Sequence, residues 1–242
     1  MSESIRTVTV FGANGPTGQL LTRQLLDAGH KVVAATRHPD SFPLTGPGLT
    51  VVRADATDPT NVALAVRDSD AVVSVLGTKY SRGPITLYSD SARAVIAAMQ
   101  ENGIRRLVVT SSMATVDWSD PNMSWIERFL VEHVLRRIGA TLYEDMQRME
   151  SLVFASDLDW TVMRPLGLAS MDPPTEYTIA RDHISGRQTA RADLAAAIAQ
   201  QLDRTDYLHA AVAVVTTNKA LNLAKTIWRE GIEPNLSSKN RR

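Results

Sequence analysis

The chain has 242 residues, with 26 basic and 26 acidic side chains and no cysteine, so its formal net charge is zero. This balance, with no basic block before the last four residues, argues against a nucleic-acid-binding surface. The missing cysteines exclude a disulfide framework and a thiol nucleophile. No stretch reaches the roughly 18 apolar residues of a membrane span, and the first ten residues lack a signal-peptide pattern. We therefore expect one cytoplasmic domain over residues 1–242, a monomer or a homodimer.

The first pattern in chain order is a short apolar strand that runs into a glycine-rich turn. Residues 8–11 form the strand, and three glycines follow it at a spacing of three. An amphipathic helix is expected over residues 19–28. A second apolar strand over residues 32–36 completes a βαβ unit of about 30 residues.

Each of the three glycines has a separate expected role. Gly12 permits the tight turn out of the strand, Gly15 lets the backbone approach a pyrophosphate, and Gly18 lets the helix pack closely on the sheet. Pro16 removes one donor, but it is tolerated in the first helical turn, where the remaining N–H groups point at an anion. The loop is therefore expected to bind a dinucleotide, the alternative being a glycine-rich turn at the end of a buried strand.

The second strand ends where a dinucleotide fold meets the adenosine ribose, in Thr36-Arg37-His38-Pro39-Asp40. A carboxylate at this place favours NAD, whereas a guanidinium suits the 2′-phosphate of NADP. Arg37, with Thr36 and His38 beside it, predicts NADPH, and NAD is the less favoured cofactor. In the alternative, Arg37 is a solvated loop residue and Asp40 binds the ribose.

Strands and helices continue to alternate along the chain. Further strands are expected at residues 49–54, 71–77, 106–110, 160–164 and 211–216. Further helices are expected at residues 61–67, 86–100, 125–138, 141–154, 191–202 and 218–230. Residues 171–188 are loop-like with two short candidate strands. This alternation predicts an α/β fold, a Rossmann-type doubly wound parallel sheet, with a small C-terminal substrate-side lobe and substrate-side segments at about residues 113–124 and 166–190.

Ligands of such sheets lie across the carboxyl ends of the strands. Polar or glycine residues follow six of the predicted strands: Gly12 to Gly18, Arg37, Asp55, Gly77, Ser111 with Ser112, and Arg164 to Leu166. Asp55 can hydrogen-bond an adenine amino group or, equally, cap the next helix. Trp118, Met123, Trp125, Met171 and Tyr177 form either a wall for a flat aromatic substrate or an apolar cover over the core. The five histidines are scattered without metal-ligand spacing, so no metal is expected.

Several of these segments together resemble the atypical short-chain dehydrogenase/reductase superfamily, in its NAD(P)H-binding, NmrA-like branch, which includes the biliverdin and flavin reductases. The matching segments are residues 10–18, 36–39, 54–58, 75–78, 110–112, 145–149 and 158–165. The resemblance covers about residues 6–203. It implies NADPH in the glycine loop, Arg37 on the 2′-phosphate, Asp55 near adenine, and the turn at residues 75–78 beside the nicotinamide ribose.

The resemblance also implies a serine near the nicotinamide and the substrate. Ser111 and Ser112 both match, and Ser112 is favoured because it lies farther out of the strand. Either hydroxyl can donate a hydrogen bond to the acceptor as hydride arrives. The alternative is a serine that satisfies backbone groups at the strand end.

One position departs from the better-known members, which carry a Tyr-x-x-x-Lys pair. Tyr143 lies at a suitable distance beyond Ser112, but Gln147 occupies the place of the lysine. Glutamine supplies no positive charge to lower the tyrosine pKa. This disfavours a sugar-nucleotide epimerase or dehydratase, and it fits either a reductase of easily reduced conjugated acceptors or a nucleotide-binding protein without turnover.

The sequence therefore predicts an NADPH-dependent oxidoreductase that transfers hydride to a flavin-, quinone- or tetrapyrrole-like acceptor, with an NmrA-type redox sensor as the alternative. The candidate catalytic residues are Ser112, Ser111 and Tyr143. The candidate cofactor-binding residues are Gly12, Asn14, Gly15, Pro16, Thr17, Gly18, Thr36, Arg37, Asp55, Ala56, Leu76, Gly77, Thr78, Thr110, Arg164 and Pro165.

Overall fold

The computed structural model describes residues 6–81, 83–117, 139–181, 184–186 and 188–217. The main sheet contains β1 (Thr7–Phe11), β2 (Lys31–Thr36), β3 (Leu49–Arg53), β4 (Ala71–Ser74), β5 (Arg106–Thr110), β6 (Asp159–Pro165), β8 (Tyr177–Ala180) and β10 (Ala210–Thr216). A second, two-stranded sheet pairs β7 (Gly167–Ala169) with β9 (Gln188–Ala190). The described helices are α1 (Pro16–Asp27), α2 (Pro59–Val66), α3 (Leu87–Glu101), α6 (Ala140–Phe154) and α7 (Arg191–Gln201), with the 3₁₀ turns η1 (Pro39–Ser41) and η2 (Met113–Thr115).

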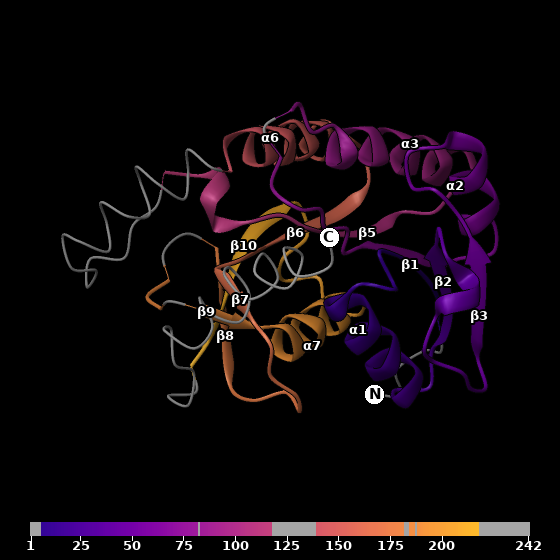
Figure 1. The fold of residues 1–242 in the computed structure, drawn as a ribbon, viewed down its shortest axis with the longest axis horizontal. Coiled ribbons are helices and arrows are strands. Elements are labelled where there is room, and N and C mark those ends of the chain that lie inside the picture. Colours follow the sequence, from indigo (N-terminus) through magenta and orange to yellow (C-terminus); the bar gives the residue numbers. More distant parts are fainter. Residues whose placement is uncertain (1–5, 82, 118–138, 182–183, 187, 218–242) are drawn as a thin grey trace, which may run out of the picture.

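The main sheet has the strand order β3-β2-β1-β4-β5-β6-β10-β8. Its pairings are parallel except for that of β10 with β8. Figure 1 shows α2, α3 and α6 along one face of the sheet and α1 and α7 along the other. The predicted Rossmann-type doubly wound sheet is therefore confirmed.

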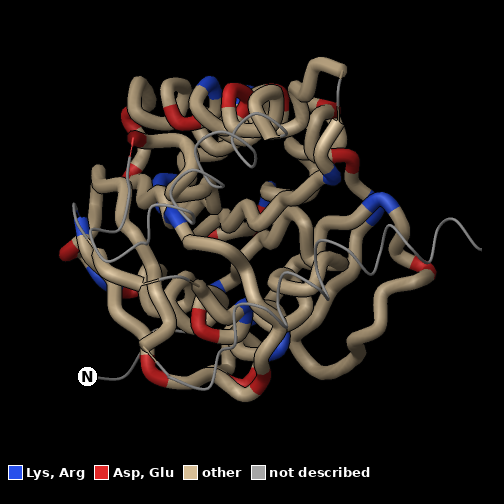
Figure 2. The backbone as a smooth tube through the Cα atoms, turned by 60° about the vertical axis from the view of Figure 1, so that its left-hand side comes forward, with Lys and Arg blue, Asp and Glu red and all other residues tan. Residues whose placement is uncertain are grey.

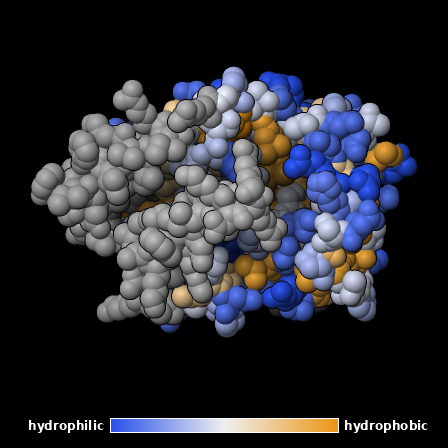
Figure 3. Space-filling model, in the orientation of Figure 1, coloured by the Kyte–Doolittle hydropathy of each residue, from blue (hydrophilic) through white to orange (hydrophobic). Residues whose placement is uncertain are grey.

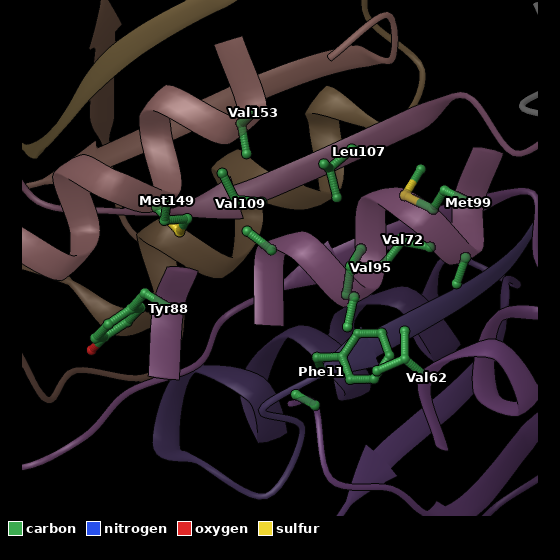
Figure 4. Close-up of a cluster of buried hydrophobic side chains, with 14 of the residues drawn as sticks. Phe11, Val62, Val72, Tyr88, Val95, Met99, Leu107, Val109, Met149 and Val153 are labelled. Atoms are coloured by element: carbon green, nitrogen blue, oxygen red, sulfur yellow. The ribbon is translucent and has the colours of Figure 1, made fainter. Parts of the chain in front are cut away.

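Two apolar layers hold the helices on the sheet. Beneath α2, α3 and α6, side chains from the sheet and the helices form one cluster, to which Phe11, Val95 and Met149 belong (Figure 4). Beneath α1 and α7, a second cluster includes Leu21, Leu25 and residues of β1, β2 and β10. Because both faces of the parallel strands are covered, their sequences are apolar through the middle, and each fully buried Val or Leu contributes roughly 1.5–3 kcal/mol.

The strand order reverses between β1 and β4, which are neighbours in the sheet although β2 and β3 lie between them in the chain. The connection after β1 leads to α1 on one face, whereas the segment after β4 leads to α3 on the other face. Loops that diverge in this way leave a crevice at the carboxyl edge, and ligands of open α/β sheets bind there. The fold thus places the glycine turn at the switch point.

Several predicted boundaries differ from the structure. β4 ends at Ser74 rather than at residue 77, because its neighbour β1 ends at Phe11; the last bond of this pairing joins the Val75 amide to the Phe11 carbonyl at 2.9 Å. α1 begins at Pro16, three residues earlier than predicted, because proline is suited to the first helical position.

In the second half of the chain, the predicted loop-like segment contains β8 and the start of β9, and β7 was not predicted. The substrate-side segment at residues 166–190 holds these three short strands, and the part of the other segment that is described, residues 113–117, holds η2. The helices predicted over residues 125–138 and 218–230 lie outside the described residues.

Charged residues of both signs are spread over the described helices and loops (Figure 2). The described part of the face in Figure 3 is mostly hydrophilic, with scattered hydrophobic groups. In the described part of the chain, no helix is long and apolar enough to cross a membrane.

The packing of α1 on the glycine turn gives a first testable prediction. A Cβ added at Gly18 would lie 2.2 Å from the Gly12 carbonyl oxygen and 2.7 Å from the Ala13 Cα. Gly18→Ala is therefore expected to lower the free energy of unfolding by at least about 1–3 kcal/mol, the usual cost of overpacking. Gly77→Ala is the control, because an added Cβ there meets no atom within 4 Å. Equal unfolding free energies for the two variants, measured by urea denaturation, would contradict this packing.

Candidate active site

The turn between β1 and α1 can be built only with glycine at its first position. Gly12 has a φ of +81°, and an added Cβ would lie 2.7 Å from the Val75 carbonyl oxygen. The left-handed backbone and the close approach of the segment after β4 both exclude a side chain. The Gly15 amide donates to the Gly12 carbonyl at 2.9 Å and closes the turn.

The N-terminus of α1 opens onto this turn. Gly15 is the N-cap, Pro16 follows it, no side chain caps the helix, and the first turn holds no acidic residue. The first N–H groups of a helix lack intrahelical acceptors, so those of Thr17 and Gly18 are left for a ligand. The helix dipole adds positive potential at the same place. A pyrophosphate fits this arrangement without any charged side chain.

Hydrogen bonds to Asn14 hold the loop before α1 in place. Gln19 donates through Nε2 to the Asn14 carbonyl at 2.9 Å, and Asn14 in turn approaches Ser41 of η1 at 3.5 Å. The glycine turn and the segment after β2 are thus neighbours at the carboxyl edge. These contacts join the predicted phosphate site to the predicted ribose site.

The predicted ribose site contains a second arginine that the sequence reasoning missed. Thr36 is buried and accepts from the His38 amide at 3.2 Å, whereas the Arg37 side chain is exposed. Arg53, the last residue of β3, donates to the Arg37 carbonyl at 2.9 Å and pairs with Asp40 at 3.2 Å. In the sequence, the only sign of this second arginine's role was its place at the end of the predicted third strand. The register of β2 with β3, which pairs Thr36 with Arg53, is needed to place it beside the predicted ribose site.

Asp55 follows β3 and turns back onto its own loop. Its carboxylate accepts from the Thr57 amide at 3.0 Å and the Thr57 hydroxyl at 2.8 Å. These hydrogen bonds hold the pKa of Asp55 below its usual value, and the charge of Arg37 acts in the same direction. The alternative that Asp55 caps α2 is wrong, because Asp58 is the N-cap and accepts from Thr60 and Asn61.

The segment after β4 runs beside the glycine turn. The Thr78 amide donates to the Tyr88 hydroxyl at 3.3 Å, which ties the segment to the start of α3. Burial raises the pKa of Tyr88 to about 12. Around Gly77, no atom of the described residues lies within 4 Å of the position of an added Cβ, so none of them fills the space beside this part of the segment.

The end of β5 carries three hydroxyl groups with different surroundings. The oxygens of Thr110 and Ser111 are buried and have no hydrogen-bond partner among the described residues. Ser112 is half-buried, and its oxygen accepts from the Ala114 amide at 3.1 Å as the cap of η2. Ser112 therefore does satisfy a backbone group at the strand end, but only with its oxygen, so its hydrogen is left to be donated elsewhere.

The α6 residues at the Tyr-x-x-x-Lys positions contact two different loops. The hydroxyl of Tyr143 lies 3.1 Å from that of Tyr80, in the segment after β4. Gln147 donates through Nε2 to the Thr115 carbonyl of η2 at 2.6 Å. The amide of Gln147 therefore holds the segment after β5, where a lysine would have supplied a charge.

One turn further along α6, a buried carboxylate joins η2 to β6. Glu150 accepts from Arg164 Nε at 2.9 Å and from Nη2 at 2.6 Å, and its Oε1 lies 3.2 Å from the Thr115 hydroxyl. The side chains of Glu150 and Arg164 are only 6% and 15% exposed. Two donor nitrogens of Arg164, a predicted cofactor ligand, are therefore already hydrogen-bonded to Glu150. Pro165 follows it as the last residue of β6.

The predicted site residues on strand ends therefore meet at one edge of the sheet, as expected. The predicted wall is only partly described: Trp118, Met123 and Trp125 lie outside the described residues. Tyr177 packs against the cluster beneath α1 and α7, which agrees with the apolar-cover alternative. Among the described residues, no group of three or more His, Asp or Glu is placed to hold a metal ion; His133 and His183 are not described.

A hollow of about 420 Å³ lies at the opposite, amino edge of the sheet. Its charged side chains neutralise one another: Arg6 pairs with Asp203 at 2.9 Å and Arg105 with Asp159 at 3.2 Å. Arg106 beneath it is buried and donates to backbone carbonyls and Thr161. This hollow lies apart from the candidate active site at the carboxyl edge, and its paired charges have a structural role.

Comparison with known proteins agrees with this geometry. A family model described as NAD(P)H-binding matches residues 12–205. A chloroplastic protein of Arabidopsis thaliana, itself described as uncharacterized, is 30% identical over 182 residues, which cover 71% of this chain and 63% of that protein. This chain thus spans less than two thirds of that relative.

Solved structures share the fold. A short-chain dehydrogenase/reductase from Veillonella parvula, in complex with NADP, has a TM-score of 0.74 and 18% identity over 90% of this chain and 98% of that one. ChuY from Escherichia coli O157:H7, described as an anaerobilin reductase, has a TM-score of 0.72 and 23% identity over 89% of this chain and 100% of that one. The family match confirms the NAD(P)H-binding part of the resemblance drawn from the sequence, and these structures confirm the fold.

The buried bridge between α6 and β6 gives a second prediction. Glu150→Ala leaves Arg164 buried without a counter-ion, so the free energy of unfolding is expected to fall by about 3 kcal/mol or more. Glu144→Ala, an exposed carboxylate on the same helix, is the control and is expected to change it by less than about 0.5 kcal/mol. The free energies of unfolding are measured by chemical denaturation. Equal decreases in the two variants would show that the Glu150–Arg164 bridge does not stabilise the fold more than an exposed carboxylate does.

Proposed function

We propose that this chain, which belongs to the NAD(P)H-binding family, is an NADPH-dependent reductase that passes hydride to a flat conjugated acceptor of the flavin, quinone or tetrapyrrole type. The observation that carries the proposal is the uncapped, positive N-terminus of α1, which opens onto the glycine turn at the switch point of the sheet. The anaerobilin reductase among the structures of like fold supports the tetrapyrrole type of acceptor.

The residues of the chain fit a bound dinucleotide in two places, at its pyrophosphate and at its adenosine ribose. The amides of Thr17 and Gly18 would bind the pyrophosphate, and the lack of a side chain at Gly15 would leave room for it. Arg37 and Arg53 supply two guanidinium groups beside the adenosine ribose, where a 2′-phosphate adds negative charge. Asp40 is held by Arg53, which disfavours the alternative in which Asp40 binds the ribose of NAD.

At the other end of the crevice, the segment at residues 75–78 lies where the nicotinamide half of the cofactor is expected. Bound NADPH would supply the hydride. Ser112 is proposed as the donor to the acceptor, because the Ala114 amide fixes its oxygen and leaves its hydrogen to stabilise negative charge that develops on the acceptor. Ser111 is the alternative donor, since its buried hydroxyl has no described partner.

Tyr143 is not proposed as a proton donor. The position of the activating lysine is held by Gln147, whose amide is directed to the Thr115 carbonyl. Glutamine at this position supplies no positive charge to make the phenol a stronger acid. The chemistry that this edge supports is therefore hydride transfer to an acceptor that needs little acid assistance.

The same observation favours a second candidate, an NAD(P)H-binding redox sensor without turnover. Such a protein needs the glycine turn and the arginines but no reacting group near the nicotinamide. Tight binding of NADPH, with no loss of its absorbance in the presence of flavins, quinones or bilins, would favour the sensor over the reductase.

The choice of cofactor is tested at Arg37. Arg37→Asp removes a charge-assisted contact to the 2′-phosphate and adds a carboxylate, so the Kd for NADPH is expected to rise by about 10–100-fold while that for NADH does not rise. Arg67→Asp, an exposed arginine at the end of α2, is the matched control. Calorimetric titration of both variants with both cofactors measures this, and an unchanged preference in Arg37→Asp would remove the assignment.

The choice between the two serines is tested by a pair of variants. Ser112→Ala is expected to lower kcat by about 10–100-fold, because one aligned donor is lost from the transition state, while the Kd for NADPH stays unchanged. Ser111→Ala is expected to have the smaller effect. The opposite order would transfer the donor role to Ser111, and unchanged kcat in both variants would mean that neither hydroxyl assists the reaction.

A further inference from the structure

Three large hydrophobic side chains are strongly exposed in the part of the chain that the structure describes. They are Leu64 at 61%, Tyr80 at 56% and Phe154 at 43%. Leu64 lies within α2, and Phe154 is the last residue of α6, which ends at the amino edge because the helix runs antiparallel to the strands that flank it. Tyr80 alone of the three lies in a segment that follows a strand at the carboxyl edge.

The exposed ring of Tyr80 is held in place by the start of α6. Its hydroxyl lies 3.1 Å from that of Tyr143, and the two rings meet edge to face with centroids 6.4 Å apart. Next to it, the Ser81 carbonyl accepts from the Thr141 hydroxyl at 3.0 Å. A residue that only covered the surface would need none of these contacts.

Gly139 makes this arrangement sterically possible. An added Cβ there would lie 2.5 Å from the Tyr143 ring and 2.9 Å from the Tyr80 ring. Both rings therefore occupy the space that a side chain at residue 139 would take. The glycine before α6 thus has a packing reason that the sequence alone does not reveal.

The pair lies at the edge where the reaction is proposed to occur. Tyr80 follows Thr78 by two residues, on the segment expected beside the nicotinamide ribose. Tyr143 precedes Gln147 by one helical turn, and Gln147 holds the carbonyl of Thr115 in η2, the turn that Ser112 caps. Contacts from one face of α6 therefore reach both segments, and residues spaced by four lie on the same side of a helix.

We propose that Tyr80, fixed by Tyr143, is a stacking surface for the planar ring of the acceptor. The inference rests on the proposed function, since it assigns a binding residue to the same site. An aromatic ring that keeps one exposed face and is already held in one rotamer binds a flat conjugated molecule at little further entropic cost.

The test compares binding of planar acceptors to the 242-residue chain loaded with NADP⁺. FMN, menadione and biliverdin are titrated by calorimetry into the wild type, Tyr80→Ala, Tyr80→Phe and Leu64→Ala. Loss of one stacking contact is expected to raise the Kd of at least one acceptor by about 3–10-fold in Tyr80→Ala. Tyr80→Phe keeps the ring and is expected to stay within about twofold of the wild type, and Leu64→Ala, which removes an equally exposed side chain on α2, is expected to leave the Kd unchanged.

Tyr143→Phe separates holding the ring from proton transfer. If Tyr143 only positions Tyr80, this variant weakens acceptor binding by a few-fold and leaves kcat at saturating acceptor unchanged. A large loss of kcat with unchanged acceptor Kd would make Tyr143 a proton donor and overturn the proposal.

The remaining outcomes distinguish this inference from the proposed function. Turnover by the wild type with equal acceptor Kd in Tyr80→Ala overturns the stacking surface and leaves the reductase standing. Acceptor binding that Tyr80→Ala weakens, without any oxidation of NADPH by the wild type, supports the surface and removes the reductase. No binding of any of the three acceptors to the wild type overturns the stacking surface.

Discussion

The backbone contact between Gly12, Gly18 and the segment after β4 is the constraint on which the rest of the site depends. The left-handed turn at Gly12 brings the chain back under α1, and the missing side chain at Gly18 lets the helix lie against the Gly12 carbonyl. The same turn touches the Val75 carbonyl. The turn after β1, the start of α1 and the segment after β4 thus meet without intervening side chains. The positive end of α1 is directed into the crevice between β1 and β4.

A second organising element is α6, whose side chains hold several loops at the carboxyl edge. Tyr143 reaches the segment after β4, Gln147 the turn after β5, and Glu150 both that turn and the end of β6. Asp145, fully buried on the same helix, accepts from the Tyr88 amide at 2.8 Å and from the Ser89 hydroxyl at 2.5 Å, and so caps α3. A preorganised edge of this kind needs little rearrangement when a cofactor and an acceptor bind.

These contacts also explain how the Tyr-x-x-x-Lys positions differ here from those of the better-known relatives. A lysine at residue 147 would add a charge next to the cofactor, whereas the glutamine adds a hydrogen bond to the Thr115 carbonyl. In this chain, the side chains of α6 hold the loops at the carboxyl edge. In our account the reaction then depends on the cofactor and on the alignment of the acceptor, and less on acid catalysis.

The sequence predicts those features that local pattern determines. The order of strands and helices, the start of β5 and the glycine turn follow from periodicity and from residues with special backbone freedom. What it could not predict depends on partners distant in the chain. Arg53 acquires its place through the register of β3 with β2, and Glu150 acquires its partner through the packing of α6 on β6. The short strand β7, which was not predicted, exists because it pairs with β9, and no local pattern indicates that pairing.

The claim at the centre of this account is that backbone amides of the glycine turn and the first turn of α1 bind the phosphates of a nicotinamide dinucleotide. Its most direct test is titration of the ¹⁵N-labelled protein with NADPH, followed by amide NMR. The account predicts large, saturable shifts of the Gly15, Thr17 and Gly18 amides, and smaller ones at Arg37 and Thr78. Unchanged Gly15, Thr17 and Gly18 amides at millimolar NADPH and millimolar NADH would contradict it.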